Sequence, residues 1–267
     1  MTLIKNNKGF TLIEILVALT IDFVVLAGIY AAFYSQQKSH VKEQQVVDAQ
    51  QNVRGAADFM TREIRLAGMQ RLTAGAAGIL TAGPYSIQFT LDRDEDDSVL
   101  GLDENLIYQF EAGADAAPLD GIADTGSGQI VRVSTNSANF APIANDIHAI
   151  AFAYAYDNNQ DGELDFVDAA PFNDQLDPGE EIWAYDSPDL ATVGLDTNNA
   201  TGAALTTAIS LDRIRAVRIW ILARTRNQLR GPPRTKSYMV GDKPINITDN
   251  YQYRLLTTTV KCRNLGI

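Results

Sequence analysis

The longest apolar run in the chain lies near its N-terminal end. It extends from Phe10 to Tyr34 and is interrupted only by Thr11, Glu14, Thr20 and Asp22. As an α-helix it would be about 37 Å long, enough to cross a hydrocarbon core of roughly 30 Å. A secretory signal peptide has a shorter apolar region, of about 7 to 15 residues, and a small-residue cleavage site after it. The pattern therefore predicts a transmembrane helix over 10–34 that stays in the mature protein.

From Ser35 to Gly68 the pattern becomes amphipathic, which predicts that the same helix continues beyond the membrane. Apolar or small residues recur every seven positions, at Val46, Val53, Met60 and Ala67. Three more lie on the intermediate turns, Ala49, Ala56 and Ile64. No proline occurs between Met1 and Gly83, and Gly68 is a plausible helix stop. We expect one helix from Phe10 to Leu66, with its second half packed on a globular head formed by 69–267.

The head shows the period-two alternation that is typical of strands. The segments with this pattern are Ser86–Leu91, Asn105–Phe110, Gln129–Ser134, Ala149–Tyr156, 181–185, 213–226 and Tyr251–Lys261. Because one face of each strand is apolar and must be buried, we expect an antiparallel sheet packed against the helix, which gives an α+β fold.

Charge is distributed unevenly along the chain, whose formal net charge is −11. Residues 91–200 hold 24 Asp and Glu against 2 Lys and Arg, whereas residues 201–267 hold 3 and 12. The excess of acid makes a nucleic-acid partner unexpected, because binding DNA or RNA needs a basic surface. The acidic middle section needs counter-ions or the basic C-terminal section packed nearby.

Candidate catalytic residues are few. Only two histidines, His40 and His148, and one cysteine, Cys262, are present, and a single cysteine offers neither an intrachain disulfide nor a metal cluster. The segment Asp124–Ser127 (D-T-G-S) copies the aspartic-protease tetrapeptide, but that mechanism needs two such carboxylates and the sequence has one copy. The sequence therefore predicts no enzyme.

Two acidic loops, each between two predicted strands, form a weak internal repeat. The second loop, 157–168, follows the calcium-loop spacing D-x-[DN]-x-[DN]-G, with further oxygen ligands at positions seven, nine and twelve. Its possible calcium ligands are Asp157, Asn159, Asp161, Glu163, Asp165 and Asp168. The first loop, with Asp92, Asp94 and Asp96, has Asp97 where the template has glycine. A solvated acidic hairpin tip is the alternative for both loops, since Asn, Asp and Gly favour turns.

The segment Lys8-Gly9-Phe10-Thr11-Leu12-Ile13-Glu14, followed by the apolar run, resembles the type III signal of type IV pilins and type II secretion pseudopilins. The resemblance implies that 1–9 is a leader, that prepilin peptidase cuts between Gly9 and Phe10, and that the new Phe10 amine is methylated. It also implies that Glu14 pairs with the Phe10 amine of an adjacent subunit. A buried carboxylate is tolerable where a cation meets it. Placement of Glu14 among the lipid headgroups is the simpler alternative, and Asp22 has no assigned role.

The order of the long helix, the acidic loops and the strands along the chain resembles that of the large minor pilins of the PilW type, which are related to the J-type pseudopilin. The motifs that carry this are the end of the helix at Arg62–Gly68, the strand at Ile214–Arg218 and the ending Arg263–Leu265. The resemblance implies a pilin-like α+β fold and a minor subunit that helps prime or cap filament assembly, with prepilin peptidase, other pilins and the inner membrane as partners.

Positive charge is slightly greater before the span, with Lys5, Lys8 and the initiating amine, than after it, with Lys38 and Lys42. This small bias favours a cytoplasmic N-terminus and a head in the periplasm, because cytoplasmic flanks carry the excess of Lys and Arg. The head would later lie on a filament or at the cell surface. Three alternatives remain. One is a minor pseudopilin of a type II secretion system, and another is a calcium-dependent adhesive head carried on a filament. The third is a membrane-anchored protein that is never processed.

Overall fold

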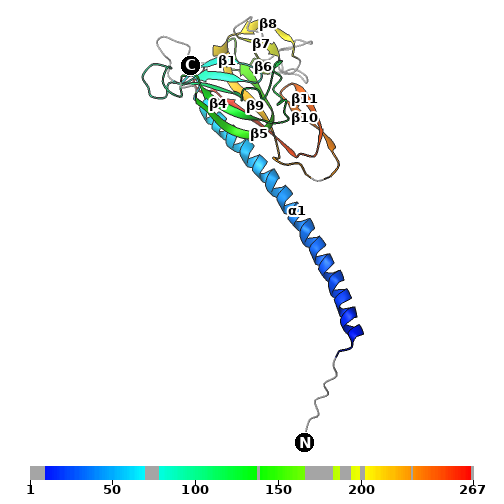
Figure 1. Cartoon of the computed structure of the whole chain (residues 1–267). Helices are drawn as coiled ribbons and strands as arrows, with labels where there is room; N and C mark the ends of the chain where they lie inside the picture. Colours follow the sequence, from blue (N-terminus) through cyan, green and yellow to red (C-terminus); the bar gives the residue numbers. More distant parts are fainter. Residues whose placement is uncertain are drawn as a thin grey trace. The chain divides into compact units, whose positions relative to one another are not determined.

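A computed structural model describes residues 10–69, 78–136, 139–165, 183–186, 194–198, 202–229 and 231–265. The chain divides into two compact units, 1–45 and 46–267, and each is described by itself. The long helix α1, Leu12–Ile64, begins in the first unit and ends in the second. Together with an antiparallel sheet it gives the predicted α+β fold (Figure 1).

The end of α1 lies close to the expected position. The helix stops at Ile64, two residues before the predicted end, and a turn follows to Gly68, whose φ of +73° is the left-handed conformation that favours glycine at a helix C-terminus. A Cβ atom at this glycine would lie 2.7 Å from Cδ2 of Leu265, near the end of the chain. Close packing and backbone conformation therefore both require glycine at position 68.

The described part of the second unit contains a sheet of ten antiparallel strands and a separate two-stranded sheet. The strands of the large sheet are β1 (Ile79–Ala82), β2 (Ile87–Thr90), β3 (Asn105–Phe110), β4 (Gly128–Ser134), β5 (Asn139–Tyr156), β6 (Trp183–Tyr185), β7 (Leu195–Asn198), β8 (Ala204–Ile209), β9 (Ile214–Arg224) and β12 (Tyr253–Lys261). A short 3-10 helix, Leu211–Arg213, leads into β9. The small sheet is the hairpin of β10 (Arg234–Val240) and β11 (Lys243–Asp249).

The long strand β5 organises the large sheet. Its first half pairs with β4, and its second half pairs with β9 and, at its end, with β6 (Figure 1). Strand β9 pairs in turn with β12. The strands predicted over 86–91, 105–110, 129–134, 149–156, 213–226 and 251–261 are confirmed within a few residues of their ends, apart from β5, which begins ten residues earlier than expected.

The central strand β5 is buried on both faces of the large sheet, and its side chains alternate in size between the two faces. Ile150, Phe152 and Tyr154 pack into the core that contains Met60 and Ile64 of α1. The residues between them are small, and they form a second apolar cluster with residues of β6, β9, β12 and the β10–β11 hairpin. The alanines of that row are Ala149, Ala151, Ala153 and Ala155.

The predicted apolar stripe on the second half of the helix is confirmed. Val53, Ala56, Met60, Ile64 and Ala67 are all buried in the core beneath the sheet. Residues of the β10–β11 hairpin pack against the opposite face of the sheet. This contact was not predicted from the sequence.

Candidate functional site

The residues of the signal motif surround the first turn of α1. Thr11 lies immediately before the helix, and its backbone N–H and its hydroxyl both donate to Oε2 of Glu14, each at 2.8 Å. The N–H of Glu14 donates back to the Thr11 hydroxyl at 3.4 Å. This reciprocal arrangement is a capping box, which satisfies donors that a helix N-terminus otherwise leaves unpaired.

Both residues to which the resemblance gives an assembly role lie on the surface of the first unit. The exposed fraction of Phe10 is 85%, and the Glu14 carboxylate is exposed, with Thr11 as its one hydrogen-bond partner among the described residues. Gly9, the residue on the other side of the expected cut, lies outside the described residues. Glu14 is thus ordered by its own helix turn and still accessible to a cation from another chain.

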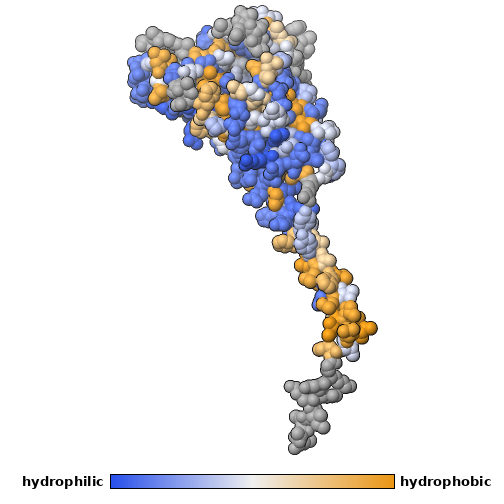
Figure 2. Space-filling model, viewed as in Figure 1, coloured by the Kyte–Doolittle hydropathy of each residue, from blue (hydrophilic) through white to orange (hydrophobic). Residues whose placement is uncertain are grey.

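Residues 10–34 of the first unit present a largely apolar surface, seen in orange in Figure 2. Within the described residues, α1 is the one helix long and apolar enough to cross a membrane, and none of its most apolar window is buried. Asp22 lies exposed within this surface, and Thr20 hydrogen-bonds to the carbonyl of Leu16. The helix and the prepilin-like motif are consistent with membrane anchoring.

At the other end of α1 a buried carboxylate joins the helix to the sheet. Oε2 of Glu63 accepts from Nε of Arg132 on β4 at 2.9 Å and from the hydroxyl of Tyr108 on β3. Oε1 of the same carboxylate accepts from Arg132 at 3.2 Å and from Arg93 at 3.1 Å. Arg132 also pairs with Asp103 at 2.9 Å. The Glu63 cluster, consisting of these five residues, fixes the end of α1 against the sheet.

The ionisation of the Glu63 cluster follows from its burial and charge. Burial lowers the pKa of Arg132, but hydrogen bonds and charge from Glu63 and Asp103 outweigh this effect and raise the pKa above its ordinary value. Burial, followed by the charge of Glu63, raises the pKa of Tyr108. The arginine is therefore charged and the tyrosine neutral throughout the working pH range.

The first acidic loop is built around two buried carboxylates. Asp92 accepts from the backbone N–H groups of Glu95, at 2.7 Å, and Asp97, at 3.1 Å. Glu104 accepts from the N–H of Arg93 at 2.9 Å and from that of Gly101 at 2.7 Å. Backbone donors thus stabilise both buried charges, which explains why a loop so rich in acid folds tightly.

Among the described residues, Asp92, Asp94 and Asp96 form the one group of three acidic or metal-ligating side chains whose ligand atoms lie within 4.8 Å of one another. Desolvation, and then the charges of Asp96 and Glu104, raise the pKa of Asp94. The grouping lies in the loop whose sequence fits the calcium template less well.

The second acidic loop is arranged differently from the template. Asp157 is buried, and its Oδ2 lies 3.5 Å from Nε of Arg215 on β9. Its other oxygen, Oδ1, is buried and has no hydrogen-bond partner within the described residues. The Asn159 amide donates to Asp161 at 2.8 Å, and Asp161 in turn accepts from the N–H of Glu163 at 2.8 Å.

Asp165 closes the described part of this loop by accepting from the N–H of Asn158, while its own N–H donates to the carbonyl of Tyr156 at 2.9 Å. Asp168 lies outside the described residues. The loop is therefore a hairpin tip ordered by Asx turns, and calcium binding there stays a prediction.

The residues considered for catalysis have structural surroundings. Asp124 accepts from the N–H of Ala116 at 2.7 Å within a turn. Nδ1 of His148 lies 2.8 Å from the carbonyl oxygen of Gly126. The rings of His148 and Tyr253 form a T-shaped pair whose centroids are 5.3 Å apart. Burial lowers the pKa of His148, the hydrogen bond to the Gly126 carbonyl raises it by less, and the charge of Arg224 lowers it further. Asp249 and Asp120 also act on this histidine and raise its pKa slightly. His40 lies exposed on α1, and Cys262 is buried.

Two functional features were missed by reasoning on the sequence. The capping box had a readable signal, because threonine followed three positions later by glutamate before an apolar run is its sequence signature. The Glu63 cluster had none, since its partners Arg93, Tyr108 and Arg132 are 30, 45 and 69 residues away in the chain.

Comparisons with known proteins agree with the N-terminal motif and with the head. The family model "Type IV Pilus-assembly protein W" (PilW) matches residues 122–264, more than half of the chain, and the prokaryotic N-terminal methylation motif matches residues 4–30. None of the curated proteins compared with the chain matches it. A solved type IV-like pilin from Thermus thermophilus is 15% identical, with a TM-score of 0.39, over 81% of this chain and 97% of that one. The chain belongs to the PilW family of type IV pilus-assembly proteins.

Proposed function

We propose that this protein is a minor pilin, a structural subunit that helps to prime or cap a type IV pilus after processing by prepilin peptidase. The observation that carries the proposal is the placement of Glu14, an accessible carboxylate at the first turn of an uncovered apolar helix. A carboxylate at membrane depth is costly unless a cation meets it. The PilW and N-methylation matches support the assignment to a pilus system.

Processing supplies that cation. Hydrolysis of the peptide bond between Gly9 and Phe10 releases residues 1–9 and leaves a free amine on Phe10, which stays basic after a methyl group is added. Because Phe10 is exposed and adjoins the capping box, its amine can approach the Glu14 carboxylate of a neighbouring subunit. The pair neutralises two charges that would otherwise be buried alone in the filament core.

The test separates the two roles of Glu14. The variant Glu14→Gln is expected to be cut and methylated, as read by intact mass, and to be absent from sheared filaments. The matched variant Thr11→Ala removes the hydroxyl of the cap and leaves the carboxylate, so it is expected to enter filaments. Normal incorporation of Glu14→Gln, or uncut chain in cells with active peptidase, would exclude the proposed mechanism. Loss of protein secretion with normal pili would instead favour the pseudopilin alternative.

We propose calcium binding by loop 157–168 as a second, separable property. Its support is the buried Oδ1 of Asp157, which has no hydrogen-bond partner in the part of the chain that the structure describes, together with the alternating Asn159 and Asp161. Because Arg215 already neutralises part of the Asp157 charge, we expect weak affinity. Calorimetric titration of the full chain with CaCl₂ should show a site that Asp161→Asn weakens and Asp94→Asn, in the first loop, leaves unchanged. Equal losses in both variants, or no heat at millimolar calcium, would count against it.

A calcium-dependent adhesive head remains the functional alternative linked to this site. It would require that surface binding, rather than filament assembly, is lost when Asp157 and Asp161 are replaced. Filaments that assemble normally with those replacements but no longer attach the cell would identify adhesion as the role of the head.

A further inference from the structure

Strand β12 forms a free edge of the large sheet. Among the described strands it pairs with β9 alone, through nine consecutive residue pairs from Tyr253↔Arg224 to Lys261↔Ala216. The pairing has no register shift, so β12 is free of bulges over its whole length. Such an edge presents a row of backbone donors and acceptors to its surroundings.

The register identifies the residues whose backbone faces outward. The N–H of Cys262 donates to the carbonyl of Arg215, and the N–H of Thr225 donates to the carbonyl of Gln252, so even-numbered residues of this strand bond to β9. In an antiparallel pair the alternate residues direct their N–H and C=O groups away from the partner. Leu255, Thr257, Thr259 and Lys261 therefore present these groups to the free edge.

The other edges of the large sheet are better protected against another strand. Strand β1 has four residues and a bulge in its pairing with β2, and β8 has six residues and a bulge in its pairing with β7. Short and bulged edges discourage strand addition. Strand β12 has nine residues, and its stretch from Leu255 to Val260 contains no charge and no proline.

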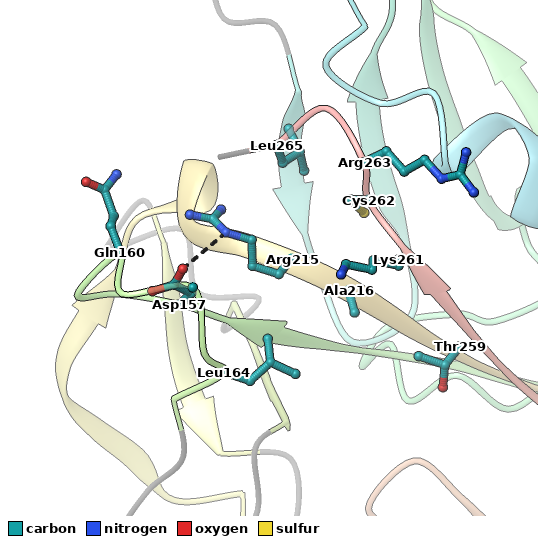
Figure 3. A pocket seen from close by; sticks show the side chains of 11 residues that line it. Asp157, Gln160, Leu164, Arg215, Ala216, Thr259, Lys261, Cys262, Arg263 and Leu265 are labelled. Carbon is teal, nitrogen blue, oxygen red and sulfur yellow. Dashed lines mark ion pairs between the residues drawn. The ribbon is translucent and has the colours of Figure 1, made fainter. Parts of the chain in front are cut away.

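The C-terminal end of β12 carries positive charge. A cavity of about 870 Å³ lies beside it, and Arg215, Lys261 and Arg263 are among its lining residues (Figure 3). Asp157 pairs with Arg215 only, and Lys261 and Arg263 have no ion-pair partner in the described part of the chain. Arg254 adds a cation near the other end of the strand. Both ends of the free edge are thus basic in a protein that is acidic as a whole.

We propose that the free edge of β12 binds, by strand addition, an extended acidic segment of another filament subunit. Backbone hydrogen bonds to Leu255, Thr257, Thr259 and Lys261 would hold the segment, as in other cases of β-augmentation. Acidic residues at its ends would meet Arg254 on one side and Lys261 and Arg263 on the other. The identity of the bound chain as a filament subunit rests on the proposed function, whereas the binding surface itself does not.

A second copy of this chain is a poorer occupant of the edge. Antiparallel pairing of two β12 strands around Thr257 would place Lys261 of each copy opposite Tyr253 of the other, one residue from Arg254. The basic end of one strand would thus lie beside the basic end of the other, and like charges at that separation repel. The charge on β12 therefore favours an acidic strand over an identical one.

The test uses the detergent-solubilised full chain and a labelled peptide of alternating threonine and valine with aspartates at both ends, followed by fluorescence anisotropy. Thr257→Pro removes an outward N–H that β9 does not use, so the fold is retained while the edge is blocked. We expect this variant to bind the peptide about tenfold more weakly or worse. The matched variant Thr257→Val keeps the N–H and should bind as the unaltered protein does.

Charge reversal gives a second readout that does not depend on proline. Changing Lys261 and Arg263 together to glutamate should abolish binding of the aspartate peptide and favour the same peptide with lysines at its ends. Equal binding of both peptides to the unaltered protein, undiminished binding to Thr257→Pro, or dimers of the full chain that Thr257→Pro dissociates would each overturn the proposal. Because the assay requires neither processing nor Glu14, its failure is distinguishable from failure of the proposed function.

Discussion

Replacing the buried carboxylate of Glu63 should destabilise the head more than replacing any other charged side chain at the end of α1. In Glu63→Gln, the amide keeps one acceptor oxygen, so Arg132 would lose the negative charge and one of its two hydrogen bonds to the helix while its side chain remains 10% exposed. Deleting one partner of a buried ion pair costs roughly 3–5 kcal/mol, because the other charge stays buried. Asp103, at 2.9 Å from Arg132, compensates in part, so we expect about 3 kcal/mol, near the lower limit of that range.

The loss is measurable by thermal or urea unfolding of the full chain in detergent. About 3 kcal/mol corresponds to a fall in Tm of roughly 6–12 °C for a domain of this size class. Glu43→Gln, at an exposed position of the same helix, is the matched control and should change stability by less than about 0.5 kcal/mol. A double-mutant cycle with Arg132→Met should show coupling between the two residues. Additive effects in that cycle, or a Glu63→Gln protein as stable as Glu43→Gln, would refute the reasoning.

Three further changes test other parts of the head by the same unfolding assay. Gly68→Val should cost about 1–3 kcal/mol, because its φ of +73° strains any L side chain and its Cβ would crowd Leu265; Gly55→Val, at an open site on the helix, controls for the substitution. Ala153→Leu should cost about 1–3 kcal/mol by overfilling the space under the β10–β11 hairpin, and an undiminished Tm would show that the space is not close-packed. His148, whose pKa is lowered in the fold, should make the head less stable as the pH falls below about 6.5, since the unfolded chain then binds the proton more readily. His148→Gln should flatten the dependence of the urea midpoint on pH in that range, and an unchanged slope would contradict this assignment.

The fold could be predicted from the sequence wherever a periodic pattern was long enough. The long apolar run and the seven-residue stripe predicted α1, and the alternation of Ile150, Phe152 and Tyr154 with alanine predicted the core strand β5. These patterns are local consequences of helix and strand geometry, so they are visible before any tertiary contact is known.

The β10–β11 hairpin was missed although its sequence contains a turn signal. Gly241 and Asp242 lie between Val240 and Lys243, and Gly241 has a φ of 64°. The two strands contain many polar residues, so the apolar alternation that marks a strand is weak in them. Their burial against the alanine row of β5 depends on the position of the large sheet, which no local pattern specifies.

The candidate sites also differ in whether a local pattern could predict them. The signal motif at Phe10 and Glu14 is contiguous, and it could be read directly. The Glu63 cluster joins α1 to residues on two strands and a loop, and the pairing of Asp157 with Arg215 joins two distant segments. Such contacts require the register between elements to be known, and one sequence does not contain that information.

The alanine row of β5 limits how the head can meet other molecules. With α1 packed against one broad face of the sheet and the β10–β11 hairpin against part of the other, the central strands are covered on both sides. Recognition is therefore expected at the acidic loops, the unpaired edge and the exposed side chains of β12. A change of partner could arise there by substitution at a few exposed positions while the interior of the head stays the same.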